Sequence, residues 1–130
     1  MIKQYAKRSK ELISRSFFAS EFDCPCDNPS CQTTWIDDEL ISNLQLLRDV
    51  CGPIRVHSGF RCALHNSQIS GSADKSRHLT GQGADISCPK MSITKLLDAC
   101  KKIDGFRDSG IGSYKSHVHV DVGRTRPARW

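Results

Sequence analysis

The run His117–Val122 reads His-Val-His-Val-Asp-Val and alternates strictly between polar side chains and valine. Successive side chains of a β-strand point to opposite faces of a sheet. The three valines therefore share one face, which we expect to be buried. Alternation of this kind describes any half-buried strand, but an ordinary exposed face has no need of two histidines. The run predicts a strand whose polar face borders a functional site, formed by His117, His119 and Asp121.

A second stretch supplies partners for that face. His78 and Asp85 are seven residues apart, with Gly81 and Gly83 between them. Glycine adopts backbone conformations that other residues avoid, so the chain can fold back and bring both side chains to one ion. One imidazole from the strand at 117–122 then completes a set of two imidazoles and a carboxylate. Three such ligands around an open fourth position are typical of a catalytic zinc site. The alternation does not decide which strand histidine is the ligand.

The cysteines form a separate feature. The chain has seven, and an odd number without a secretory signal argues against a complete disulfide framework. Cys24, Cys26 and Cys31 lie in a loop rich in turn-forming residues. Their spacing supplies three thiolates where structural zinc sites use four, and the sequence does not place a fourth, such as Cys62. A structural metal site, a disulfide and packed free thiols all remain open.

Periodicity predicts the elements around these motifs. We expect one helix from Asp37 or Asp38 to Cys51, with a buried stripe that includes Val50, and another from Ser92 to Gly105. Strands are expected at 53–58 and 84–88, and a hairpin at 110–114 and 117–122. We expect residues 62–76 to form a loop with one helical turn near 63–67. Residues 17–22 are expected to form an arm that packs onto the domain. Helices and strands segregate, so the class is α+β, with flanking helices on a small, mostly antiparallel sheet.

Length and charge limit the other possibilities. The 130 residues suit one domain, with residues 1–16 as an amphipathic lead-in that can be helical and 123–130 as a basic tail. The net charge of +5 attracts polyanions, but no interleaved aromatic and basic pattern indicates specific nucleic-acid binding. We find neither a signal peptide nor a run long enough to span a bilayer. We therefore expect cytoplasmic synthesis, no membrane insertion and a monomer.

Four motifs resemble, in order, the zinc D-Ala-D-Ala carboxypeptidase family, which includes cell-wall carboxypeptidases and many phage endolysins. They are S-G-F-R at Ser58–Arg61, H-N at His65–Asn66, S-x-H-x-x-G-x-x-x-D at Ser76–Asp85, and H-V-H-V-D at His117–Asp121. The resemblance runs from about Phe17 to the C-terminus. It implies a small α+β zinc-peptidase fold that is shared with the hedgehog signalling domain.

The resemblance also implies a cofactor and its ligands. Zn²⁺ would be bound by His78, Asp85 and His119. Ser76 and Asp121 are candidates for side chains that orient those ligands, although ordinary hydrogen bonding explains them equally well.

Two further residues receive catalytic roles from the resemblance. Arg61 matches the family arginine that steers a substrate carboxylate or carbonyl, and His117 matches the histidine beside the metal. Other branches carry a catalytic glutamate three residues before the last zinc ligand. Ser116 stands there in this chain, which leaves His117 as the acid/base candidate.

The expected function is a zinc-dependent peptidase that hydrolyses peptidoglycan stem peptides, as a D-Ala-D-Ala carboxypeptidase or as an endolysin-type endopeptidase. Such a protein would act on the cell wall after holin release or as part of a virion. The alternative is a non-catalytic zinc-binding or virion assembly module of the same fold. The intact set of catalytic and ligand residues favours the enzyme. A nucleic-acid-binding protein with a cysteine zinc cluster is disfavoured because the cysteine ligand set is incomplete.

Overall fold

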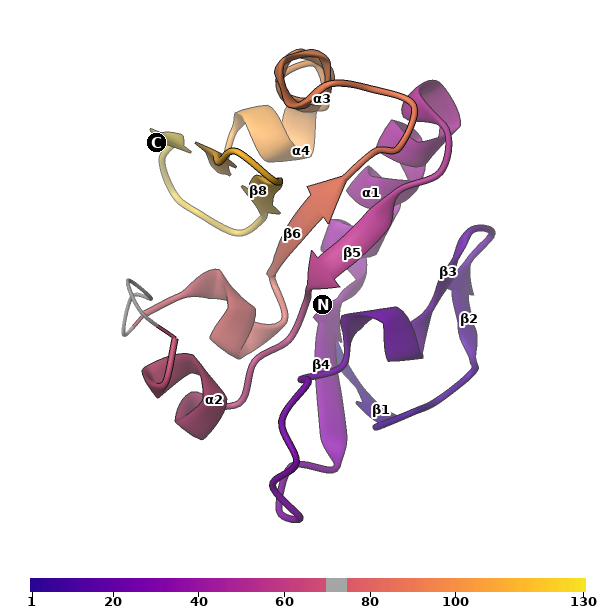
Figure 1. Cartoon of the computed structure of the whole chain (residues 1–130), viewed down its shortest axis with the longest axis vertical. Coiled ribbons are helices and arrows are strands. Elements are labelled where there is room, and N and C mark those ends of the chain that lie inside the picture. Colours follow the sequence, from indigo (N-terminus) through magenta and orange to yellow (C-terminus); the bar gives the residue numbers. More distant parts are fainter. Residues whose placement is uncertain (70–74) are drawn as a thin grey trace.

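A five-stranded sheet forms the centre of the computed structural model, which describes residues 1–69 and 75–130 (Figure 1). Its strands lie in the order β5 (Arg55–Ser58), β6 (Gly83–Ser87), β8 (Val118–Asp121), β7 (Gly110–Ser113) and β9 (Ala128–Arg129). The first four pair antiparallel, whereas β9 joins β7 in parallel. The α+β class with a small, mostly antiparallel sheet is thereby confirmed.

The N-terminal residues form strands. β1 (Ile2–Ala6) pairs antiparallel with β4 (Thr33–Asp37), and β2 (Leu12–Ser14) pairs with β3 (Phe17–Phe18). The helical interpretation of residues 1–16 is therefore wrong. The backbone groups of β1 find their partners in a strand far along the chain, which local periodicity does not reveal.

The expected arm follows and packs as predicted. A short 3₁₀ helix, η1 (Ala19–Phe22), succeeds β3. Phe17 and Phe22 are almost fully buried, and their rings meet edge to face with centroids 5.9 Å apart. This aromatic pair attaches the arm to the main core.

Helix α1 (Asp38–Cys51) begins and ends as predicted. The Asp37 carboxylate accepts a hydrogen bond from the backbone N–H of Glu39, which caps the first turn. The stripe of Leu40, Ile41, Leu44, Leu47 and Cys51 is buried. Val50, expected in that stripe, is instead 72% exposed, because it lies on the outer side of the last turn.

The second predicted helix is shorter than expected. α3 (Ile93–Cys100) begins after the Ser92 cap, whose hydroxyl accepts from the N–H of Lys95. It ends at Cys100 rather than at Gly105. A separate turn, α4 (Asp104–Arg107), contains Gly105, and the break lets Phe106 enter the core, where it is fully buried.

Helices cover one face of the sheet, and the polar motifs lie on the other. Ala84 and Ile86 of β6 and Val118 and Val120 of β8 are completely buried in the core with leucines of α1 and α3. Figure 1 shows α1, α3 and α4 together at one end of the view and α2 (Ala63–Ser67) at the other. The predicted burial of the valine face is confirmed.

The loop predicted at 62–76 contains the expected helical turn, α2. A 3₁₀ helix, η2 (Arg77–Thr80), begins just after this range. Residues 70–74 of that predicted loop lie outside the described residues. Within the described ranges, no helix is long and apolar enough to cross a membrane.

Part of the segment expected to form a basic tail belongs to the central sheet. Ala128 and Arg129 pair with Gly110 and Ile111 of β7. The N–H of Trp130 also donates to the Ile111 carbonyl. The segment at 123–130 thus returns to the sheet edge beside the polar face.

Candidate metal centre

Two neighbouring strands and the turn before them form a compact polar centre. Asp85 of β6 and His119 of β8 stand directly opposite in register, with Asp85 Oδ1 and His119 Nδ1 3.0 Å apart. His78 comes from η2, and its Nε2 lies 3.2 Å from Asp85 Oδ1. All three residues are buried, and one donor atom from each lies within 4.8 Å of the others. The structure therefore brings the three predicted metal ligands together.

The remaining nitrogen of each imidazole is held by an acceptor. His78 Nδ1 lies 2.6 Å from the Gly59 carbonyl oxygen, which can only accept, so this nitrogen carries the proton. His119 Nε2 lies 2.8 Å from Asp121 Oδ2 in the same kind of contact. Each ring is thus fixed so that its other nitrogen faces Asp85. Two imidazole nitrogens and one carboxylate oxygen converge on one point, a donor set that fits Zn²⁺.

The electrostatics of the centre favour a bound cation. Burial alone would raise the pKa of Asp85, but hydrogen bonds with His119 and His78 lower it well below its ordinary value. Burial likewise opposes the charge on Asp121, yet hydrogen bonds from His119, Arg124 and Ser109 lower its pKa. For His119, burial lowers the pKa, while hydrogen bonds with Asp121 and Asp85 raise it by more. Both carboxylates are ionised, and a metal ion can replace the proton between His119 and Asp85.

The two orienting residues predicted from the sequence both touch a ligand residue. Ser76 caps η2, since its hydroxyl accepts from the backbone N–H of His78 at 3.2 Å. Asp121 is fully buried and accepts from the Ser109 hydroxyl at 2.6 Å as well as facing His119. The first holds the turn that carries one ligand, and the second holds the ring of the other.

Arg61 also reaches the centre. Its Nη2 donates to Asp85 Oδ2 at 3.1 Å, the oxygen that does not face His78 and His119. Its Nε donates to the Ser58 hydroxyl at 3.0 Å. The guanidinium is largely buried, so it both neutralises Asp85 and stands beside the point on which the ligands converge.

The two histidines of the polar face occupy different environments. His119 is buried between two carboxylates, whereas the side chain of His117 is 24% exposed and its Nε2 lies 3.9 Å from Asp85 Oδ2. His117 stacks on Tyr114, with ring centroids 4.5 Å apart and planes 13° apart. The Ser116 hydroxyl lies 2.9 Å from His117 Nδ1. His117 thus stands at the edge of the centre with Nε2 directed toward it.

An aromatic ring beside the centre was not predicted from the sequence. The Trp130 ring lies 5.0 Å from the His119 ring, and its Nε1 donates to the Tyr114 hydroxyl at 2.8 Å. Arg124 packs over the same indole, 5.4 Å from its centroid. Gly112 stands opposite His119 in the sheet, and a Cβ there would collide with the Trp130 ring. The glycine at this position is a local sequence signal that agrees with a close-packed ring.

His57 lies beside His117 at the edge of the centre. Its Nε2 lies 2.7 Å from the Ser87 hydroxyl, and its ring centroid is 6.2 Å from that of His117. Burial and the positive charge of Arg55 lower its pKa. Through His117 it neighbours the centre without supplying a ligand atom to the His78–Asp85–His119 group.

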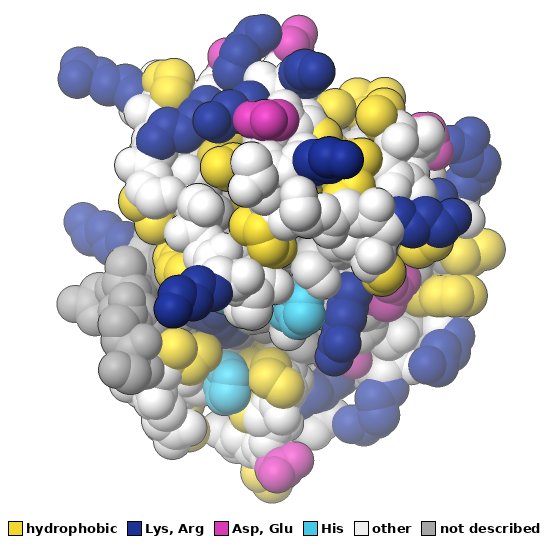
Figure 2. Space-filling view, turned by 45° about the horizontal axis from the view of Figure 1, so that its top comes forward, with side chains coloured by type: hydrophobic (Ala, Val, Ile, Leu, Met, Phe, Trp, Pro, Cys, Tyr) yellow, Lys and Arg dark blue, Asp and Glu magenta, His cyan; other side chains and the backbone are white. Residues whose placement is uncertain are grey.

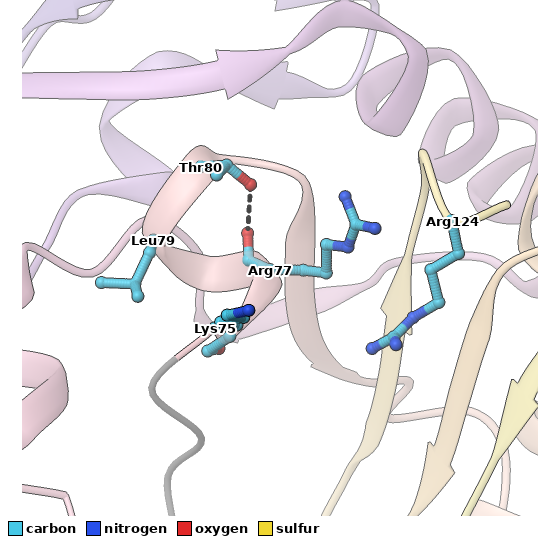
Figure 3. Close-up of a pocket in the computed structure, with 6 residues that line it drawn as sticks. Lys75, Arg77, Leu79, Thr80 and Arg124 are labelled. Atoms are coloured by element: carbon cyan, nitrogen blue, oxygen red, sulfur yellow. Dashed lines mark hydrogen bonds between the residues drawn. The ribbon is translucent and has the colours of Figure 1, made fainter.

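A basic pocket of about 450 Å³ adjoins the centre. Its lining consists of Lys75, Ser76, Arg77, Leu79, Thr80 and Arg124. In Figure 3, Arg77 extends from η2 toward the segment that carries Arg124. Arg124 also bonds Asp121, at 3.0 Å, so the pocket lies next to His119. Figure 2 shows Lys and Arg side chains spread over one face of the molecule. Such a pocket attracts acidic groups.

A small α+β fold with a buried centre of two histidines and one carboxylate defines a zinc hydrolase type of site. A family model described as Peptidase M15 matches residues 15–121, and the chain belongs to this family. The zinc D-Ala-D-Ala carboxypeptidase of Streptomyces albus G is 34% identical over 88 residues, which cover 64% of this chain. The chain spans 34% of that relative's length. The family, this relative and the His/Asp group together identify Zn²⁺ as the cofactor.

Proposed function

We propose that His78, Asp85 and His119 bind a catalytic Zn²⁺ and that the chain hydrolyses peptide bonds in peptidoglycan stem peptides. The observation that carries the proposal is that one ligand atom from each of His78, Asp85 and His119 lies within 4.8 Å of the others, in a chain of the peptidase M15 family. His117 and Arg61 both lie next to Asp85. They supply a proton-transfer group and a cationic group for peptide hydrolysis.

Residues of the chain itself would transfer the proton and position the group that transfers it. Bound Zn²⁺ would lower the pKa of a water molecule toward about 7 and polarise a carbonyl group. His117 Nε2 would take the proton from the attacking water and return it to the leaving amine, a role that imidazole groups commonly fill in hydrolysis. Stacking on Tyr114 and the contact with Ser116 hold the His117 ring in position for both transfers.

Cationic side chains beside the centre would bind the substrate. Arg61 would steer the substrate carbonyl or carboxylate, with its guanidinium oriented by Ser58 and Asp85. The pocket formed with Lys75, Arg77 and Arg124 has room and charge for an acidic group of the stem peptide. The positive charge beside the centre supports an acidic peptide as substrate.

The test is incubation of the zinc-loaded protein with purified muropeptides, followed by mass spectrometry. Release of the terminal alanine would identify a carboxypeptidase, and cleavage within or between stem peptides an endopeptidase. His117→Ala should abolish most product, whereas His65→Ala, which changes a histidine outside the centre, should not. A folded, zinc-bearing wild-type protein that forms no product would contradict the proposal and favour a binding module.

A further inference from the structure

Four cysteines from two distant stretches of the sequence meet in a second cluster, separate from the main core. Cys24, Cys26 and Cys31 come from the loop before β4, and Cys62 from the residue that caps α2. Their four sulfur atoms all lie within 4.8 Å of one another. The structure thus supplies the fourth thiol that the sequence did not place. Phe60 packs beside the cluster.

The sulfur spacing matches a tetrahedral metal site. A Zn–S distance of about 2.3 Å places the corners of a regular tetrahedron about 3.8 Å apart. The Cys24 and Cys62 sulfurs are 3.7 Å apart, and those of Cys26 and Cys62 are 3.8 Å apart. A disulfide requires about 2.05 Å, and all four cysteines are free thiols in the structure.

The surroundings suit sulfur atoms that carry negative charge. The backbone N–H of Cys62 donates to Cys24 Sγ at 3.4 Å, and the N–H of His65 donates to Cys62 Sγ at 3.5 Å. The Lys7 ammonium lies 3.8 Å from Cys26 Sγ and 2.9 Å from the Cys26 carbonyl. Four thiolates around a divalent cation carry a net charge of about −2, which these donors and the ammonium partly offset.

We propose that Cys24, Cys26, Cys31 and Cys62 bind a structural Zn²⁺, separate from the His78–Asp85–His119 centre. All four positions are filled by protein ligands, so this ion has no place for substrate. It joins the N-terminal part of the chain to the residue after Arg61. The site thereby holds the loop that positions the Arg61 guanidinium on Asp85. Neither its ligands nor its spectroscopic signature depends on the proposed peptidase activity.

Metal analysis under reducing conditions tests the proposal. Wild-type protein should contain about two equivalents of zinc, and His119→Ala about one. Cys26→Ser and Cys31→Ser should each lose the ion that His119→Ala retains. Cys51→Ala is the matched control, because it removes a buried thiol of the main core and should keep the metal content of the wild type.

Wild-type protein alone provides a second test, which holds even if a cysteine variant does not fold. Co²⁺ substituted into the protein should give the intense near-ultraviolet charge-transfer absorption of a thiolate-bound ion, which imidazole and carboxylate ligands do not produce. A thiol reagent should react with the cluster only after a chelator is added. Absence of the cobalt–thiolate absorption, or a disulfide within the cluster in freshly reduced protein, overturns the proposal. Loss of zinc from the histidine centre alone would leave it standing.

Discussion

Replacing Asp121 by Asn removes a single charge behind the metal centre and leaves the shape of the side chain almost unchanged. The Asp121 carboxylate is fully buried and accepts from the Ser109 hydroxyl, the Gly110 N–H, Arg124 and His119. An amide has only one acceptor oxygen. If that oxygen keeps Ser109 and Gly110, the amide NH₂ must face Arg124 and His119, which are themselves donors.

The expected losses of folding stability and of zinc affinity follow from the hydrogen bonds that Asp121→Asn removes. Removing one partner of a buried ion pair costs about 3–5 kcal/mol. The side chain of Arg124 is 31% exposed and can recover some hydration, so we expect the lower end, about 3 kcal/mol. His119 Nε2 loses the acceptor that fixes its tautomer, and changes of this kind weaken metal binding by about 10–100-fold. A domain of ordinary stability remains folded after losing about 3 kcal/mol, so the weaker zinc binding can be measured on folded protein.

Urea denaturation and zinc competition with a chelator, on the same preparations, measure the two effects. Asp49→Asn is the matched control, because it removes an exposed carboxylate paired with Arg15 and should change stability by less than about 1 kcal/mol. If Asp121→Asn protein is folded and binds zinc as tightly as the wild type, the contact between Asp121 and His119 Nε2 does not orient the His119 ring for metal binding.

Three further outcomes are expected. His119→Ala should lose zinc from the histidine centre, whereas His117→Ala should keep zinc and lose about 10²–10⁴-fold in hydrolysis; equal zinc loss in both would show that the roles are misassigned. Gly81→Ala should destabilise by more than about 1 kcal/mol in urea, because Gly81 has φ +76° and a Cβ would collide with the Trp35 carbonyl. The pKa of Asp121 is lower in the folded protein than in the unfolded chain, where it is about 3.9. The ionised carboxylate therefore contributes its full stabilisation above that value, and the contribution is lost progressively as the pH falls from there toward the folded-state pKa. Wild type should therefore lose more stability than Asp121→Asn between about pH 6 and pH 3, and parallel losses would contradict the assignment.

Local patterns in the sequence were sufficient to predict much of the centre. Alternation placed His119 and Asp121 on the face opposite the buried valines, and the structure has them there. Helical spacing and an Asp37 cap predicted α1 within a residue. These inferences succeed because the period of a strand or helix depends only on neighbouring residues, and because burial follows from that period.

Pairings between distant segments could not be obtained in this way. β1 was mistaken for part of a helical lead-in because its partner, β4, lies about thirty residues away. Trp130 reaches the His119 ring only because β9 returns to β7, and no local pattern indicates that return.

The sequence by itself determined which residue types face the polar side of the sheet, and it supplied the set from which a zinc centre can be built. Tertiary structure decided their individual environments. It buried His119 between Asp85 and Asp121, left His117 partly exposed beside Tyr114, and brought Cys62 to the other three thiols. Strand alternation is identical for both histidines, and burial, charge and ligand number depend on segments that meet only when the chain folds.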